Sequence, residues 1–131
     1  MIVDTSALVA ILRAEPEAAR LAKAMADSDI LRMSAANFLE SAIVIDSSRE
    51  PVASRRFDDL IQACDLRIEP VTQEHAQVAR NAYRDYGKGS GHPAQLNFGD
   101  CFAYALARST GEPLLFKGQD FNHTDIPSVP F

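Results

Sequence analysis

The stretch MIVDTSALVAIL (residues 1–12) decides the fold that this sequence predicts. Residues 1–3 form an apolar run typical of a short buried strand, and apolar residues resume after Asp4 with the spacing of a helix. The two hydroxyl residues that follow Asp4 suit the first turn of that helix, so we expect a hydroxyl cap there. A carboxylate at the end of a core strand is unusual, and its role depends on the rest of the chain.

Strand and helix patterns continue to alternate after this stretch. Further strands are predicted at residues 30–33, 66–71 and 113–117, and further helices at 15–29, 35–48, 50–64, 73–86 and 96–109. This alternation predicts the α/β class, with a parallel sheet. Right-handed crossovers would place helices on both faces of the sheet.

Composition indicates one domain, residues 1–131, because a chain of 131 residues with 47% hydrophobic content can build a single well-packed core. The longest apolar run, residues 8–12, is far too short to cross a bilayer, so we expect a soluble, cytoplasmic protein with no membrane partner. Cys64 and Cys101 form no paired motif and are predicted to be reduced.

The net charge of −5 argues at first against a nucleic-acid partner, because phosphate binding normally shows as a basic excess. Two bound divalent cations would offset most of that charge. The overall charge therefore does not decide the question.

Two acidic residues stand near the ends of the first two predicted strands. Asp4 follows the first strand directly, where it is either a helix cap or a functional carboxylate. Glu40 lies on a helix that is apolar on nearly every side, so it should be partly buried. A buried carboxylate needs a cation, a hydrogen-bond network or a raised pKa, and the structural alternative is an internal salt bridge to an arginine such as Arg32.

Two more acidic residues accompany the last predicted strand. Asp100 opens the helix before it, where complementing the helix dipole is a sufficient explanation, and Asp120 follows it, where an ordinary turn after Gly118 would also suffice. The carboxyl ends of parallel strands share one edge, so all four carboxylates should converge there. Such a cluster favours Mg²⁺ or Mn²⁺, and two such ions can support phosphodiester hydrolysis.

Four segments together resemble a known family: residues 2–9 (IVDTSALV), Glu40 in its helix, residues 97–107 (NFGDCFAYALA) and residues 114–121 (LLFKGQDF). They resemble the acidic signatures of PIN-domain ribonucleases, specifically the VapC toxins of type II toxin–antitoxin systems. The resemblance implies a three-layer α/β/α domain with a short parallel sheet and a Mg²⁺ or Mn²⁺ site. It also implies cleavage of single-stranded RNA, homodimerisation and inhibition by a VapB-type antitoxin.

Carried over by motif, Asp4, Glu40 and Asp100 are the catalytic, metal-binding carboxylates. Gly118 stands where many relatives are acidic, so the fourth role passes to Asp120 or lapses. Thr5 and Ser6 match hydroxyls that either orient a water molecule or cap the helix.

Other active-site classes fit less well. A haloacid dehalogenase phosphatase would need a second acid where Ser6 stands, and the glycine-containing loop at residues 87–95 is neither a dinucleotide fingerprint nor a P-loop. We interpret that loop as lying on the substrate side.

The sequence thus predicts a metal-dependent endoribonuclease toxin, with a catalytically weak RNA-binding or interaction module as the alternative. An antitoxin segment is expected in a groove between the helices at 15–28 and 38–45.

Overall fold

The computed structural model describes residues 1–131 and contains a parallel sheet of four short strands. The strands are β1 (Ile2–Val3), β2 (Arg32–Ser34), β3 (Arg67–Glu69) and β4 (Leu114–Leu115). Their order is β3-β2-β1-β4, so β1 lies in the centre between β2 and β4. Because the pairing is parallel throughout, the carboxyl ends of all four strands lie at one edge.

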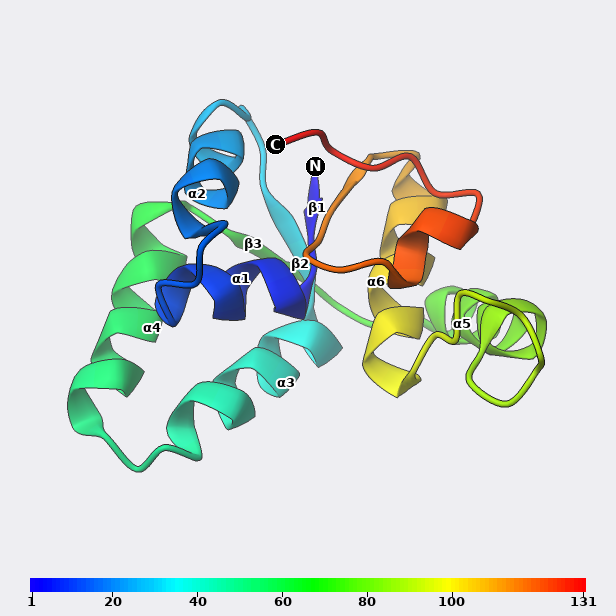
Figure 1. Cartoon of the computed structure of the whole chain (residues 1–131), viewed down its shortest axis with the longest axis horizontal. Helices are drawn as coiled ribbons and strands as arrows, with labels where there is room; N and C mark the ends of the chain where they lie inside the picture. Colours follow the sequence, from blue (N-terminus) through cyan, green and yellow to red (C-terminus); the bar gives the residue numbers. More distant parts are fainter.

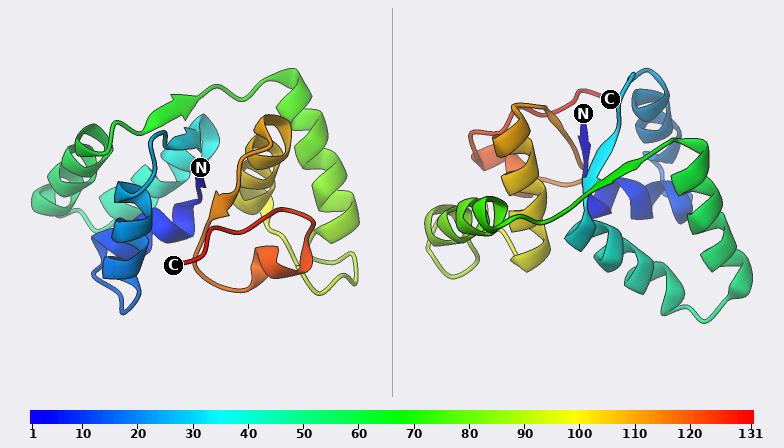
Figure 2. Two further views of the ribbon diagram at one scale, coloured as in Figure 1. Left: turned by 90° about the horizontal axis from the view of Figure 1, so that it is seen from above. Right: turned by 180° about the vertical axis from the view of Figure 1, so that it is seen from behind.

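Helices cover both faces of the sheet, as predicted. They are α1 (Thr5–Leu12), α2 (Ala18–Ala26), α3 (Ala35–Asp46), α4 (Pro51–Ala63), α5 (Gln73–Tyr86) and α6 (Phe98–Thr110). Figure 1 shows α1 to α4 on one side of the strands and α5 and α6 on the other. Seen from behind in Figure 2, β3 carries the chain from α4 across to α5, and so joins the two helical layers. The predicted three-layer α/β/α architecture is confirmed.

Each face of the sheet has its own hydrophobic core. Successive strand residues point to opposite faces, so Ile2 and Leu114 pack with α5 and α6, whereas Val3 and Leu115 pack with α1, α2 and α4. All four side chains are fully buried. The two-residue strands β1 and β4 therefore hold the layers together through this alternation.

The helix caps follow the sequence with one exception. Ser34 and Thr72 cap α3 and α5 through side-chain hydrogen bonds, as predicted. The expectation of a hydroxyl cap on α1 is wrong, because the capping residue is Asp4, whose carboxylate accepts the Ser6 N–H. The hydroxyls of Thr5 and Ser6 are thereby left for other contacts.

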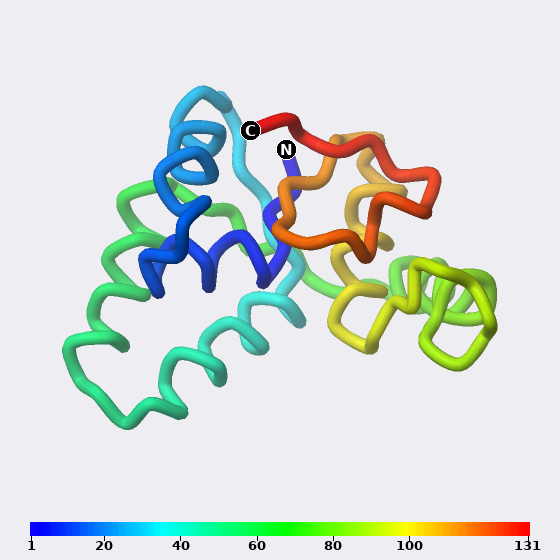
Figure 3. The backbone as a smooth tube through the Cα atoms, viewed as in Figure 1, coloured from blue at the N-terminus to red at the C-terminus, as the bar shows by residue number.

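The chain after β4 returns toward the sheet. It forms a short 3₁₀ helix, η1 (Asp120–His123), which the sequence did not predict, and then pairs Ser128 with Leu114. Figure 3 shows this last segment running back beside β4. None of the helices is both long and apolar enough to cross a membrane.

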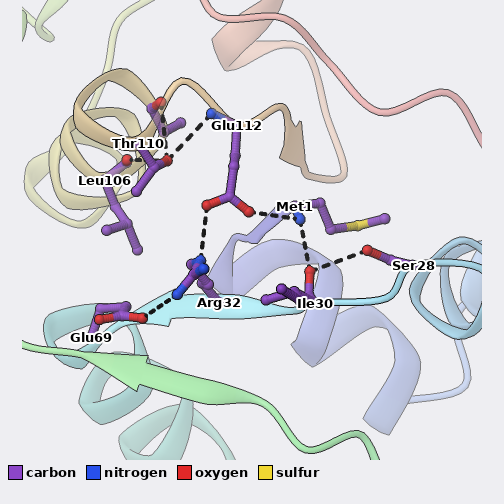
Figure 4. Close-up of polar contacts among 9 residues, drawn as sticks. Met1, Ser28, Ile30, Arg32, Glu69, Leu106, Thr110 and Glu112 are labelled. Carbon is purple, nitrogen blue, oxygen red and sulfur yellow. Dashed lines mark hydrogen bonds and ion pairs between the residues drawn. The ribbon is translucent and has the colours of Figure 1, made fainter.

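An ion-pair network ties the sheet together at the amino end of β2 (Figure 4). The Arg32 guanidinium bridges the carboxylates of Glu69 and Glu112, at 2.8 and 2.9 Å, and Glu112 also pairs with the Met1 amino group at 3.1 Å. Arg32 is thus fully engaged away from α3. The alternative that Glu40 forms a salt bridge to Arg32 is wrong.

Candidate active site

The four predicted site residues come from four different elements. Asp4 directly follows β1, Glu40 lies on the second turn of α3, Asp100 lies on the first turn of α6, and Asp120 opens η1 after β4. The negative charges of Asp4, Asp120 and Glu40 all contribute to raising the pKa of Asp100. The structure therefore places Asp4, Glu40 and Asp120 within electrostatic range of Asp100, at the edge of the sheet where the parallel strands end.

Asp4 is a buried carboxylate, with 3% of its surface exposed. Its Oδ2 accepts hydrogen bonds from the backbone N–H and the Oγ of Ser6, at 2.9 and 2.6 Å. Burial nevertheless raises its pKa to about 6, because desolvation outweighs these bonds and the Glu40 charge adds to it. The Ser6 Oγ in turn accepts the Lys117 N–H at 2.9 Å, which fixes the chain after β4 against Asp4.

Glu40 is half-buried and is held by a hydroxyl instead of a cation. The Thr5 Oγ1 donates to Glu40 Oε1 at 2.5 Å, and the Asn37 Nδ2 donates more weakly to the same oxygen at 3.4 Å. The backbone of Gly99 lies against the other side of the carboxylate, so closely that a methyl group there would overlap Oε2. Thr5 and Gly99 thus fix the Glu40 carboxylate between α1 and α6.

Asp100 combines a structural and an electrostatic role. It forms a capping box with Asn97: the Asn97 N–H donates to Asp100 Oδ2 at 3.0 Å, and the Asp100 N–H donates to Asn97 Oδ1 at 2.9 Å. Burial raises the pKa of Asp100 to about 7, with the neighbouring carboxylates adding to the rise. Asp100 lies in the first turn of α6, as the helix-dipole alternative expected, and its capping contact coexists with its electrostatic coupling to the other carboxylates.

The three buried or half-buried carboxylates share one arrangement. Each uses one oxygen for hydrogen bonds within the protein, and its other oxygen, Oδ1 of Asp4 and Asp100 or Oε2 of Glu40, has no hydrogen bond. None of the three takes part in a salt bridge. The only fully buried side-chain oxygens without a partner are Glu17 Oε2 and Asn37 Oδ1, so the free carboxylate oxygens reach solvent.

Lys117 is a basic residue in the loop after β4, and its side chain is engaged away from the cluster. Its ammonium pairs with Glu15 and with Glu17, so both acids raise its pKa. The cluster therefore lacks a basic partner from the chain itself. Like charges without a counter-ion repel, and a divalent cation would remove that repulsion.

Sequence reasoning missed the structural part played by Asn37. This residue is fully buried, and its Nδ2 donates to the Gly99 carbonyl at 2.9 Å, which fastens α3 to the first turn of α6. Its Oδ1 is buried without a partner. An amide one turn before Glu40 on a nearly apolar helix was the available signal, because a buried polar group must be bonded.

Asp120 differs from the other three carboxylates. It is exposed, it makes no side-chain hydrogen bond or ion pair, and it lies in the first turn of η1. Its charge still acts on Asp100. The chain therefore supplies a fourth carboxylate near the cluster, more loosely held than the others.

The donor set fits a hard divalent cation that keeps part of its water shell. No three Asp, Glu, His or Cys side chains lie close enough together to ligate one ion directly. Mg²⁺ is usually bound by one or two carboxylates and several waters, so a few free carboxylate oxygens facing solvent match its needs. The absence of sulfur and imidazole from this set disfavours zinc.

Three cavities lie against the helices that surround the cluster. One of about 600 Å³ lies between α5 and α6. Two others are bordered by α1, α2 and α4 and by α1, α3 and α4. Neither of these two cavities is lined by both α2 and α3, because α1 lies between those helices and packs against each of them, so the expected groove between α2 and α3 is not found.

Comparison with known families gives a match over nearly the whole chain. The PIN domain family matches residues 1–127. The VapC ribonuclease Mb0625 of Mycobacterium bovis is 58% identical over 126 residues, covering 96% of this chain and 95% of that protein. The ribonuclease VapC of Mycolicibacterium smegmatis is 49% identical over 129 residues, covering 98% of this chain and 99% of that protein.

Solved structures show the same fold at low sequence identity. VapC20 of Mycobacterium tuberculosis, described as a toxin that cleaves the sarcin-ricin loop, has a TM-score of 0.76 at 18% identity and covers 98% of this chain and 97% of that chain. A chain of a toxin–antitoxin complex from Klebsiella pneumoniae has a TM-score of 0.75 at 16% identity, covering 99% and 97%.

Proposed function

The chain belongs to the PIN domain family, among its VapC ribonucleases, and we propose that it is an endoribonuclease toxin that cleaves single-stranded RNA with a divalent metal ion. The observation that carries this proposal is the arrangement of Asp4, Glu40 and Asp100. Three carboxylates converge without a basic partner, and each keeps one oxygen free of hydrogen bonds. Such a cluster is costly for the apoprotein and useful only when it holds a cation.

The chain's own residues have separate parts in this proposal. Asp4, Glu40 and Asp100 would hold Mg²⁺ or Mn²⁺ through their free oxygens. Ser6 and Thr5 orient two of these carboxylates by hydrogen bonds to the opposite oxygens. The capping alternative for Thr5 and Ser6 is wrong, because both hydroxyls donate to carboxylates and Asp4 caps the helix. That one of these hydroxyls also orients a water molecule stays a prediction.

The metal ion supplies the reactive chemistry when it is bound: it lowers the pKa of water to give a nucleophile and stabilises negative charge on phosphate oxygens. The protein contributes buried and half-buried carboxylates that hydrogen bonds from Ser6, Thr5 and Asn97 keep in place. Burial also strengthens their attraction for a cation, because water screens it less there. No side-chain nucleophile is required in this mechanism.

A second candidate function is a catalytically weak RNA-binding or interaction module of the same fold. The observation that favours it is the lack of three side chains arranged to ligate one ion directly. One experiment distinguishes the two functions.

Purified protein is freed of metal with EDTA and then given Mg²⁺ or Mn²⁺. If it is a ribonuclease, it should cleave single-stranded RNA only after the metal is restored. Sequencing the cut ends would identify the preferred site, and RNA binding without cleavage in either metal would support the second function.

Asp120 supplies a separate prediction about the fourth acidic position. Asp120→Ala should raise the Mg²⁺ concentration needed for half-maximal cleavage by a few-fold. The effect should be smaller than that of losing Asp4 or Asp100, because Asp120 is exposed and the other three carboxylates remain. A Mg²⁺ titration of the cleavage rate measures this effect, with Asp125→Ala as the matched control, because Asp125 instead bonds Tyr104 and Arg108. A titration identical to the parent's would assign Asp120 to the turn alone.

We propose two protein partners, a VapB-type antitoxin and a second copy of the chain. The neighbour from a toxin–antitoxin complex supports the first. An antitoxin segment would fit the mostly apolar cavity bordered by α1, α2 and α4. A basic residue from that partner reaching Asp4, Glu40 or Asp100 would replace the charge of the metal, so antitoxin and Mg²⁺ should bind competitively.

A further inference from the structure

The cavity between α5 and α6 is separate from the carboxylate cluster but adjoins it. It has a volume of about 600 Å³, within the usual range for small-molecule sites. Figures 1 and 2 show α5 and α6 side by side, on the side of the sheet opposite α1 to α4. We name it the α5–α6 groove, and its walls include Arg80, Tyr83, Lys88, Asn97, Phe98 and Phe102.

Aromatic side chains dominate the apolar part of the groove. Phe98 is 79% exposed, and its ring meets that of Phe102 edge to face with centroids 4.9 Å apart. Tyr83 on α5 is 52% exposed. A phenylalanine so open to water contributes little to folding, and its accessible face is a surface on which a planar ligand can stack.

The charges of the groove are opposite to those of the rest of the protein. Arg80 and Lys88 line it and no acidic residue does, although the chain carries a net charge of −5. The Tyr83 hydroxyl donates to the Lys88 carbonyl at 3.1 Å, which holds the loop at residues 87–95 beside the groove. This combination of aromatic rings and cations suits a ligand with a flat apolar face and a phosphate.

The groove is continuous with the site through the first turn of α6. Asn97 lines the groove and also forms the capping box with Asp100, and Phe98 immediately follows it. A nucleotide seated in the groove would therefore lie beside the carboxylates. Its neighbour along the strand would reach them.

We propose that the α5–α6 groove binds one unpaired nucleobase of the RNA, next to the phosphodiester that is cleaved, with Phe98 as the stacking platform and Arg80 and Lys88 on the adjoining phosphates. This inference rests on the proposed ribonuclease function and adds a base-binding subsite to it. Stacking tolerates any base, so the groove favours single strands over duplexes without fixing the sequence by itself.

The test uses short fluorescein-labelled RNA oligonucleotides in EDTA, with Asp4→Asn as the background so that no cleavage occurs. Phe98→Ala should bind RNA about 5- to 150-fold more weakly, which is the usual loss for one stacked base. Phe98→Tyr should restore binding. Val52→Ala is the matched control, since Val52 is 64% exposed on α4, and it should bind like the background.

A series of oligonucleotides with one abasic position locates the stacked base. Removing the base at one position only, adjacent to the cleavage site, should weaken binding to the background protein by the same factor as Phe98→Ala. The Phe98→Ala protein should bind this abasic RNA as tightly as it binds intact RNA, because the missing base and the missing ring belong to the same contact. If the abasic RNA binds Phe98→Ala more weakly than intact RNA does, the two losses are independent and the assignment of Phe98 is wrong.

The charge part of the proposal has its own measurement. Arg80→Gln should lower the slope of log affinity against log salt concentration by about 0.7, the value for one phosphate of a single strand. Arg55→Gln, which removes an exposed arginine on α4, should leave the slope unchanged. Equal slopes for all three proteins would overturn the phosphate contact.

Two outcomes separate this inference from its premise. If the parent protein cleaves RNA and Phe98→Ala cleaves and binds equally well, the subsite is wrong while the ribonuclease function stands. If the parent protein cleaves no RNA under any metal, the function itself has failed. Sedimentation of Phe98→Ala tests the competing occupant: a dimeric parent that becomes monomeric through this change would assign the groove to contact between two copies and overturn the base-binding proposal.

Discussion

Asp4→Asn and Asp100→Asn should each reduce metal-dependent RNA cleavage at least ~100-fold, because changes to groups that merely support metal ligands already cost 10- to 100-fold. The amide keeps the shape of the carboxylate and its ability to accept a hydrogen bond. In Asp4→Asn, the Ser6 N–H still has an oxygen to bind, so the start of α1 should remain intact. What the change removes is the negative charge that holds the cation.

The same two substitutions should stabilise the apoprotein. Burial raises the pKa of Asp4 to about 6 and that of Asp100 to about 7, both above the value of 3.8 for a free aspartate. A carboxyl group whose pKa is raised by folding favours the folded state fully below pH 3.8, and that contribution is lost as the pH rises through the folded-state value. The parent apoprotein should therefore lose stability between about pH 4 and pH 7 on account of these groups.

An asparagine has no charge to desolvate, so the variants should escape this loss. For Asp4, the rise of the pKa from 3.8 to about 6 corresponds to at most ~3 kcal/mol of stability lost by pH 8. Thermal melts in EDTA at pH 5 and pH 8 measure this difference in stability. The melting temperature of Asp4→Asn should exceed that of the parent by more at pH 8 than at pH 5. Added Mg²⁺ should stabilise the parent but not the variants.

Asp59→Asn is the matched control, because Asp59 is an exposed carboxylate on α4 without an ion pair. It should change neither the activity nor the pH dependence of the melting temperature. Full activity in Asp4→Asn and Asp100→Asn would contradict the proposed metal site. A loss of activity together with a loss of apoprotein stability would instead assign both carboxylates to the fold.

Much of this architecture was predictable, because periodicity along the chain reports burial. The apolar run before Asp4 and the helical spacing after it predicted β1 and α1, and the same patterns predicted the other strands and helices. The convergence of the carboxylates followed from topology alone. Parallel strands put their carboxyl ends at one edge, whatever the side chains are.

The contacts that depend on tertiary packing were not predictable from local patterns. The Thr5 hydroxyl finds Glu40, 35 residues away, and the Asn37 amide finds the Gly99 carbonyl, 62 residues away. Local sequence favoured capping for Thr5, and the stronger cap, Asp4, was already in place. The hydroxyl was therefore free for a partner that only the folded chain brings near.

Gly99 gives the second prediction, because it lies where α6 touches the Glu40 carboxylate. A Cβ atom at this position would overlap Glu40 Oε2 and lie only 2.6 Å from Cδ, closer than real Cβ atoms approach a neighbour. The carboxylate is the movable end of a long side chain, so it should swing away and break the Thr5 hydrogen bond. We expect Gly99→Ala to reduce cleavage by roughly 10- to 100-fold, the usual cost of misplacing a metal ligand.

Gly99→Ala should stabilise the fold although it reduces cleavage. Gly99 lies in the first turn of α6 without a positive φ angle, and alanine is the better helix former by up to about 1 kcal/mol. Gly111→Ala provides the contrasting control. Gly111 ends α6 at a φ of 73°, and an added methyl group would meet no atom within 4 Å, so alanine there should cost about 1 kcal/mol and leave cleavage unchanged.

Urea unfolding and RNA cleavage are measured on both glycine variants. Together they distinguish an effect on the position of the Glu40 carboxylate from an effect on the stability of the fold. Gly99→Ala should fold at least as well as the parent yet cleave poorly, and Gly111→Ala should fold less well yet cleave normally. The double variant Gly99→Ala with Glu40→Gln should be no less active than Glu40→Gln alone, because both changes act through one carboxylate. If the losses multiply, Gly99 acts on the site by another route; if Gly99→Ala keeps full activity, the position of the Glu40 carboxylate does not limit the reaction.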